Sequence, residues 1–151
     1  MHHRIDWLSW TMPTEVNILS ASDLYLAASA ALRSIGDDFN QYLMVGKSFD
    51  NSTGRAPYRH SLARLDKGLF IYGGGHLKSV LFELTGRGCA DLDGWETATG
   101  FINGISEGIT RLDFASDVRT TTLPSSFVNA RKHKGFRSLS FIQSATGETC
   151  Y

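Results

Sequence analysis

The segment from residue 58 to residue 84 constrains the fold of this chain more than any other. It contains three short segments with the composition of strands, residues 58–65, 69–72 and 77–84. Two tight connections separate them, Asp66-Lys67-Gly68 and Gly73-Gly74-Gly75. Glycine adopts the backbone conformations that short hairpin turns need, so the pattern predicts a meander of three antiparallel strands.

The remaining sequence supplies strands and helices around this meander. Apolar residues at helical spacing predict a helix from Ser22 to Gly36, and a second helical piece to about Leu43 is left open. Period-two alternation predicts a strand from Ile109 to Asp117. The other expected elements are a strand at 4–11, a loop at 50–54, helices at 89–103 and 124–133, and a strand at 136–142. This order predicts an α+β domain, an antiparallel sheet with helices packed on one face, of the ferredoxin-like kind.

Length and composition restrict the class of protein. The chain has 151 residues, 42% hydrophobic and 20% charged, which suits one globular domain and excludes collagen-like and disordered proteins. No apolar run approaches the roughly 18–20 residues that cross a bilayer, and the first residues do not read as a signal peptide. Cys89 and Cys150 are too few for a disulfide scaffold or a four-ligand zinc site. We therefore expect a reduced, cytoplasmic protein with no membrane partner.

Charge is balanced over the whole chain but not along it. Fifteen Lys and Arg match fifteen Asp and Glu, and zero net charge argues against a general nucleic-acid-binding protein. Residues 118–147, however, hold five basic side chains and no acidic one. On composition alone, both a solvated basic surface and a nucleic-acid contact remain open.

One motif for nucleophilic catalysis can be set aside. Residues 104–108 read G-I-S-E-G, the pattern of the nucleophile elbow of serine hydrolases. That elbow follows a strand and opens a helix, whereas here a helix is expected before it and a strand after it. The segment is predicted to be a plain helix-to-strand turn.

Acidic residues on the predicted strands are the strongest candidates for chemistry. Glu83 lies within the run 77–84, and Asp113 and Asp117 share one face of the strand that starts at Ile109. A carboxylate held within a strand costs free energy unless it is ion-paired, hydrogen-bonded or metal-bound. Arg111 lies on the same face and offers Asp113 a structural ion pair, so structural and functional roles both remain open from the residues alone.

Several segments form a series with a definite order. E-L-T-G-R-G-C runs from Glu83 to Cys89, T-R-L-D-F-A-S-D from Thr110 to Asp117, and I-D-W-L-S-W-T occupies residues 5–11. The strand segments 58–61 and 71–74 lie between them. In this order and spacing the series resembles the replication initiation factor family, the rolling-circle initiators of small plasmids and filamentous phages. The resemblance covers most of residues 4–117 and, more loosely, residues 136–151.

The resemblance implies a metal-dependent nickase. Members of the family cut single-stranded or extruded origin DNA with a tyrosine, which forms a 5′-phosphotyrosyl link and frees a 3′-hydroxyl primer for DNA replication. It implies Mg²⁺ or Mn²⁺ held by Glu83 and Asp113, with Asp117 or Asp6 as a third ligand. It places the nucleophile at Tyr151, because G-E-T-C-Y matches the start of the family's tyrosine segment. We expect Glu83 and Asp113 to lie on neighbouring strands and to point to the same helix-free face.

The family pattern normally continues beyond the position of Tyr151. The resemblance therefore implies an N-terminal fragment of an initiator, which would nick poorly or not at all. It also implies a homodimer and the host replication helicase and polymerase as partners.

Contacts with DNA are expected from basic and aromatic side chains. The basic candidates are Arg111, Arg131, Lys132 and Lys134. Trp7 and Trp10 would stack on unpaired bases or pack in the core. Two other functions stay open: a non-catalytic DNA-binding or regulatory module of the same fold, and a ferredoxin-like protein with an unrelated interaction role.

Overall fold

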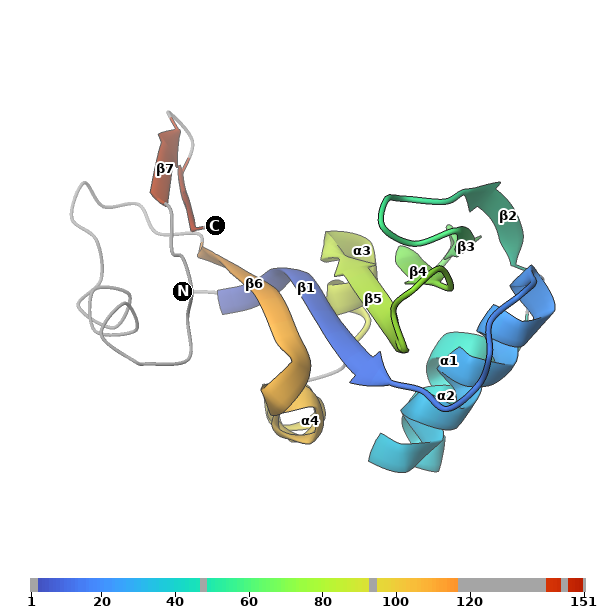
Figure 1. Cartoon of the computed structure of the whole chain (residues 1–151). Coiled ribbons are helices and arrows are strands. Elements are labelled where there is room, and N and C mark those ends of the chain that lie inside the picture. Colours follow the sequence, from blue (N-terminus) through green and yellow to red (C-terminus); the bar gives the residue numbers. More distant parts are fainter. Residues whose placement is uncertain (1–2, 47–48, 93–94, 117–140, 145–146, 151) are drawn as a thin grey trace.

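An eight-stranded antiparallel sheet forms the centre of the protein (Figure 1). The computed structural model describes residues 3–46, 49–92, 95–116, 141–144 and 147–150. The strands are β1 (His3–Pro13), β2 (Asp50–Thr53), β3 (His60–Arg64), β4 (Leu69–Gly73), β5 (Ser79–Thr85), β6 (Ile109–Ser116), β7 (Phe141–Ser144) and β8 (Gly147–Cys150). The helices are α1 (Ala21–Ile35), α2 (Asp37–Met44), α3 (Gly86–Ala90) and α4 (Trp95–Ile105), with a 3₁₀ turn η1 (Ser106–Gly108) after α4. Across the sheet the strands run β2-β3-β4-β5-β1-β6-β8-β7.

The expected meander is present as β3, β4 and β5, which are neighbours both in sequence and in the sheet. Gly68, in the turn between β3 and β4, has a φ of 59°. Gly74 and Gly75, between β4 and β5, have φ values of 80° and 88°. Residues with a Cβ rarely adopt these angles, so the three glycines permit the tight connections.

Strand β1 lies in the middle of the sheet, between β5 and β6. The chain reaches the meander from β1 through α1 and α2, and it reaches β6 from β5 through α3 and α4. The inner strands therefore have the order β4-β5-β1-β6. The predicted α+β class, an antiparallel sheet with helices, is confirmed, while the narrower ferredoxin-like assignment stays a prediction.

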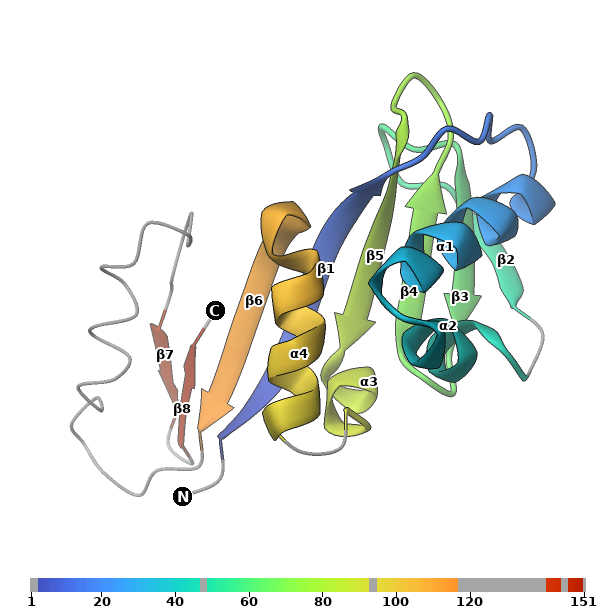
Figure 2. The ribbon, with the colours of Figure 1, turned by 90° about the horizontal axis from the view of Figure 1, so that it is seen from below.

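Helices α1, α2 and α4 lie on one face of the sheet, and Figure 2 looks onto that face with the helices in front of the strands. Helix α1 begins where the Ser20 hydroxyl accepts a hydrogen bond from the Asp23 backbone N–H at 3.1 Å. Its buried residues, Leu24, Ala27, Ala28, Ser29, Ala31 and Leu32, recur at helical spacing. None of the helices in the described part of the chain is long and apolar enough to cross a membrane.

Aromatic side chains fill the core between the sheet and the helices. Trp10 of β1 stacks on Phe82 of β5, with ring centroids 4.9 Å apart. Phe101 of α4 meets Trp10 edge-on at 5.0 Å and Phe39 of α2 at 4.7 Å. These rings join both helical connections to the central strands.

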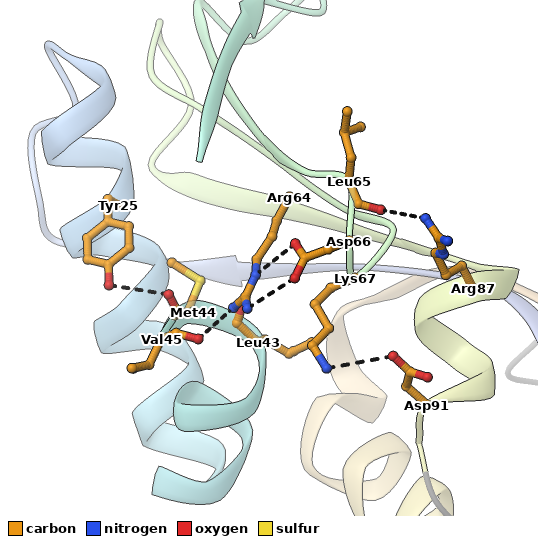
Figure 3. A network of polar contacts seen from close by, with 10 residues as sticks. All are labelled: Tyr25, Leu43, Met44, Val45, Arg64, Leu65, Asp66, Lys67, Arg87 and Asp91. Atoms are coloured by element: carbon orange, nitrogen blue, oxygen red, sulfur yellow. Dashed lines mark hydrogen bonds and ion pairs between the residues drawn. The ribbon is translucent and has the colours of Figure 1, made fainter. Parts of the chain in front are cut away.

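A buried arginine joins α2 to the end of β3 (Figure 3). Arg64 donates hydrogen bonds to the carbonyls of Leu43 and Val45, each at 2.9 Å, and pairs with Asp66 at 3.2 Å. The last carbonyls of a helix have no partner within the helix, so Arg64 satisfies groups that burial would otherwise leave unpaired.

Two segments differ from the sequence expectation. Residues 50–53 form strand β2 rather than a loop, because their backbone pairs with β3 at the sheet edge despite turn-forming side chains. The single helix expected at 89–103 is replaced by α3, which already starts at Gly86, and by α4. The strand expected at 136–142 coincides with β7 only at 141–142, and its remainder and the helix expected at 124–133 lie outside the described residues.

Candidate functional site

The sheet face opposite α1, α2 and α4 carries Glu83 and Asp113, two of the acidic residues that the sequence singles out. On β1, Leu8 and Trp10 are fully buried in the core, so Trp7 and Ser9 point to the other face. Ser9 pairs in register with Glu83 of β5 on one side and with Arg111 of β6 on the other. No helix among the described elements covers this surface, which we call the helix-free face.

Glu83 is buried beneath an arginine that comes from the connection between β2 and β3. Arg55 forms a short ion pair with Glu83, and the exposed fraction is 58% for the arginine side chain and 10% for the glutamate. The Arg55 guanidinium also lies 5.8 Å from the centre of the Tyr72 ring. Burial raises the pKa of the Tyr72 phenol, and the negative charge of Glu83 raises it further. Glu83, Arg55 and Tyr72 are called the Glu83 triad below.

Asp113 has the same kind of surroundings on the other side of β1. Arg111 donates from Nη2 to Asp113 Oδ2 at 2.6 Å and from Nε to the same oxygen at 3.0 Å. The Arg111 side chain is 46% exposed, whereas the Asp113 side chain is only 2% exposed. Its guanidinium lies 4.7 Å from the centre of the Trp7 ring, and Trp7 Nε1 donates to Ser9 Oγ at 2.9 Å. Asp113, Arg111 and Trp7 are called the Asp113 triad below.

The two carboxylates share a face, but they are not on neighbouring strands. Glu83 lies in the row of Ser9, and Asp113 lies in the row of Trp7, so the register puts both on the helix-free face as expected. The expected adjacency is wrong, because β1 separates β5 from β6. Adjacent strands lie about 4.8 Å apart, so two strand spacings, about 10 Å, separate the two backbones.

This arrangement does not fit one divalent cation shared by Glu83 and Asp113. Each carboxylate is bound by its own arginine, and strand β1 lies between them. Within the described residues, no three His, Cys, Asp or Glu side chains gather closely enough to hold a metal ion. Asp6, a predicted third ligand, lies against Gly86 at the start of α3, where a Cβ would meet its Oδ1 at 2.8 Å.

Several predicted site residues lie outside the described residues. They are the predicted ligand Asp117, the nucleophile Tyr151 and the basic residues Arg131, Lys132 and Lys134. Their roles stay predictions. Strand β8, which ends at Cys150, pairs with β6, so the described chain next to Tyr151 lies beside the strand that carries Asp113.

The two tryptophans of β1 have different surroundings. Trp10 is fully buried in the aromatic core and takes the structural role that the sequence left open. Trp7 points to the helix-free face, where its ring contacts Arg111. Of the two, only Trp7 is placed to stack on a ligand.

The sequence interpretation missed Arg55 and Tyr72. Alternation offered a signal for Tyr72, which lies between the buried residues Ile71 and Gly73 of β4 and must therefore face the other way. Arg55 had no such signal, since it lies in a connection whose path depends on the sheet. Tyr58, from the same connection, places its ring 6.4 Å from that of Tyr72.

A pocket of about 620 Å³ lies at the end of β1 and is lined in part by the G-I-S-E-G segment. Lys78, Ser106 and Glu107 are among its lining residues. Helix α4 ends within the segment and β6 follows it, in the helix-to-strand order that the sequence predicts, so Ser106 does not occupy a strand-to-helix elbow. The pocket therefore lacks the geometry of a serine hydrolase.

The chain matches no protein-family model, no curated protein and no solved structure.

Proposed function

We propose that this protein is the nicking domain of a rolling-circle replication initiator, acting on single-stranded or extruded origin DNA. One observation carries the proposal. Glu83 and Asp113, the acidic residues of the two most specific motifs, are both nearly buried on the helix-free face, on either side of β1. A shared face gives the two motifs a common site, although they are far apart in sequence.

The positions of the motif segments in the sheet support the same proposal. Residues 5–11 lie in β1, the segment from Glu83 to Cys89 covers the end of β5 and most of α3, and the segment from Thr110 to Asp117 contains most of β6. These three strands are adjacent, in the order β5-β1-β6. The ferredoxin-like arrangement is proposed for the inner strands β4-β5-β1-β6.

The proposed reaction is a transesterification at phosphorus. The Tyr151 hydroxyl oxygen forms a bond to the phosphorus, the bond from phosphorus to the 3′ oxygen breaks, and the proton passes through solvent to the released 3′ oxygen. Arg55 and Arg111 are half-exposed above buried carboxylates, where cationic groups would offset charge on the phosphoryl oxygens. Mg²⁺ or Mn²⁺ dependence stays part of the proposal because the resemblance implies it, but Glu83 and Asp113 do not share one ion and no step is assigned to it. The enzyme would act in the cytoplasm as a homodimer, with the host helicase and polymerase.

A second function, a non-catalytic DNA-binding module, is favoured by a different observation. Both carboxylates are already bound by arginines, which leaves the helix-free face with two exposed guanidinium groups rather than two exposed acids. Such a face binds phosphate without requiring a metal ion or a nucleophile.

Nicking assays separate these functions. The protein is incubated with a library of supercoiled plasmids carrying random hairpin inserts, in Mn²⁺, in Mg²⁺ and in EDTA. The initiator proposal predicts slow conversion to open circles in Mn²⁺ or Mg²⁺, weakened by Glu83→Gln and Asp113→Asn but not by the control Asp91→Asn. Salt-sensitive DNA binding without any nicking would support the non-catalytic module, and the absence of both would reject both functions.

A further inference from the structure

We propose that the Glu83 triad and the Asp113 triad are two phosphate clamps that hold one single strand of DNA across β4, β5, β1 and β6. The inference rests on the proposed function for the identity of the ligand. It adds how the strand is held and which residues hold it. Arg55 and Tyr72 thereby acquire a role that the motifs do not assign, and Trp7 keeps the base-stacking role expected from the sequence.

Arg55 and Arg111 supply the positive charge of the helix-free face. Each guanidinium is half-exposed and bonded to a nearly buried carboxylate, so its position is fixed while part of it remains accessible. Arg111 uses Nε and Nη2 to bind Asp113, fewer donors than the five N–H groups of a guanidinium. The acids lie below the arginines, so a ligand that approaches the helix-free face meets positive charge first.

Aromatic rings lie beside both arginines. Each arginine lies over a ring on the same face, Arg55 over Tyr72 at 5.8 Å and Arg111 over Trp7 at 4.7 Å. Tyr58 extends the Tyr72 side, with ring centroids 6.4 Å apart. Cationic groups that follow a backbone, next to rings on which bases stack, are typical of surfaces for single-stranded nucleic acid. A duplex keeps its bases stacked inside and would leave these rings unused.

The spacing of the triads determines how one DNA strand would contact both of them. Glu83 and Arg111 lie in one row, with Ser9 between them, so two strand spacings of about 4.8 Å separate their backbones. The two guanidinium groups are therefore placed to contact different phosphates of one strand rather than the same phosphate. A DNA strand that spans them would cross the sheet strands.

Binding of a fluorescent oligothymidylate in EDTA, measured over a series of salt concentrations, tests the clamps independently of nicking. In each triad the two charged residues are replaced together, and the resulting double variants are called the triad pairs. They are Arg55→Gln with Glu83→Gln, and Arg111→Gln with Asp113→Asn. The net charge is unchanged, and no buried charge is left unpaired. The matched control is Lys67→Gln with Asp91→Asn, an ion pair that lies near α2 and α3 (Figure 3). Thermal melts check that every variant folds.

We expect each triad pair to weaken binding about ten-fold and to reduce the slope of log K against log salt by about 0.7, the value for one phosphate contact on a single strand. Trp7→Ala and Tyr72→Ala should weaken binding at least five-fold without changing the slope, because stacking releases no counterions. The control pair should bind like the unmodified protein.

The possible failures are distinguishable. If oligothymidylate does not bind, or if the triad pairs bind like the control pair, the clamps are wrong even where nicking is observed. If duplex DNA binds as tightly as the single strand, and binds independently of Trp7 and Tyr72, the inferred ligand is wrong. If the triads govern single-strand binding but no nicking occurs, the inference holds and the initiator proposal fails.

Discussion

At the scale of single residues, Asp113 forms a buried ion pair and also fixes the position of Arg111, which is proposed to bind DNA. Asp113 is almost inaccessible, whereas its partner Arg111 is half-exposed. A buried ion pair of this kind is weak evidence for a contribution to stability, because desolvation offsets much of the attraction. Its consistent effect here is to fix the position of a half-exposed guanidinium.

Cys89 gives a residue-scale prediction for pH. Burial raises the pKa of its thiol to about 12, from an ordinary 9.0, and the charges of Asp6 and Asp113 contribute. A raised pKa means that the unfolded state loses its proton first, so this stabilisation is present below pH 9 and declines as pH rises toward 12. In a Cys150→Ser background, Cys89 should resist alkylation by iodoacetamide at pH 8.5 until urea unfolds the protein. Rapid alkylation of the folded protein would contradict the buried position.

The two tryptophans of β1 give a second residue-scale prediction. Trp10→Ala should lower the free energy of unfolding by about 3–5 kcal/mol, because it removes the ring between Phe82 and Phe101. Trp7→Ala should cost clearly less, since Trp7 lies on the helix-free face. Urea denaturation of both variants measures the difference, and equal losses would place Trp7 in the core as well.

At the scale of elements, the predicted parts of the fold are those that local chemistry determines. The glycines around 68 and 73–75 fix the meander, and alternation puts Arg111 and Asp113 on one face. The position of β1 between β5 and β6 was not predictable in this way, because period-two alternation reports which face a residue occupies and not which strand lies beside it. For the same reason, the adjacency expected for Glu83 and Asp113 was wrong. Arg55 reaches the site from a connection, so its role depends on the assembled sheet.

The contact between α2 and β3 gives an element-scale prediction. Arg64→Ala should lower the free energy of unfolding by about 3 kcal/mol, because it leaves the buried carbonyl of Leu43 and that of Val45 without their donor. Arg64→Lys should recover only part of this loss, since an ammonium group cannot reproduce the planar fork of hydrogen bonds. Chemical denaturation with the exposed control Arg33→Ala tests this contact, and a loss no greater than that of the control would show that Arg64 does not hold α2.

At the scale of the whole molecule, the groups that stabilise the fold and the groups proposed to bind DNA lie on opposite faces of the sheet. The aromatic core lies between the sheet and its helices, whereas the charged and aromatic groups of both triads lie on the opposite face. Substitutions on the helix-free face are therefore expected to alter binding more than folding. Replacing both charged residues of a triad preserves this separation, because it leaves no unpaired charge within the sheet.

The central claim is that the helix-free face supports nicking by a tyrosine, and mass spectrometry of the covalent product tests it most directly. The protein is incubated with single-stranded DNA and Mn²⁺, then digested with nuclease and protease. We predict a small yield of a peptide that carries a 5′-phosphonucleotide on Tyr151, abolished by Tyr151→Phe and strongly reduced by Glu83→Gln. An adduct on another tyrosine would move the nucleophile, and the absence of any tyrosine-linked nucleotide from a protein that binds the DNA would contradict the claim.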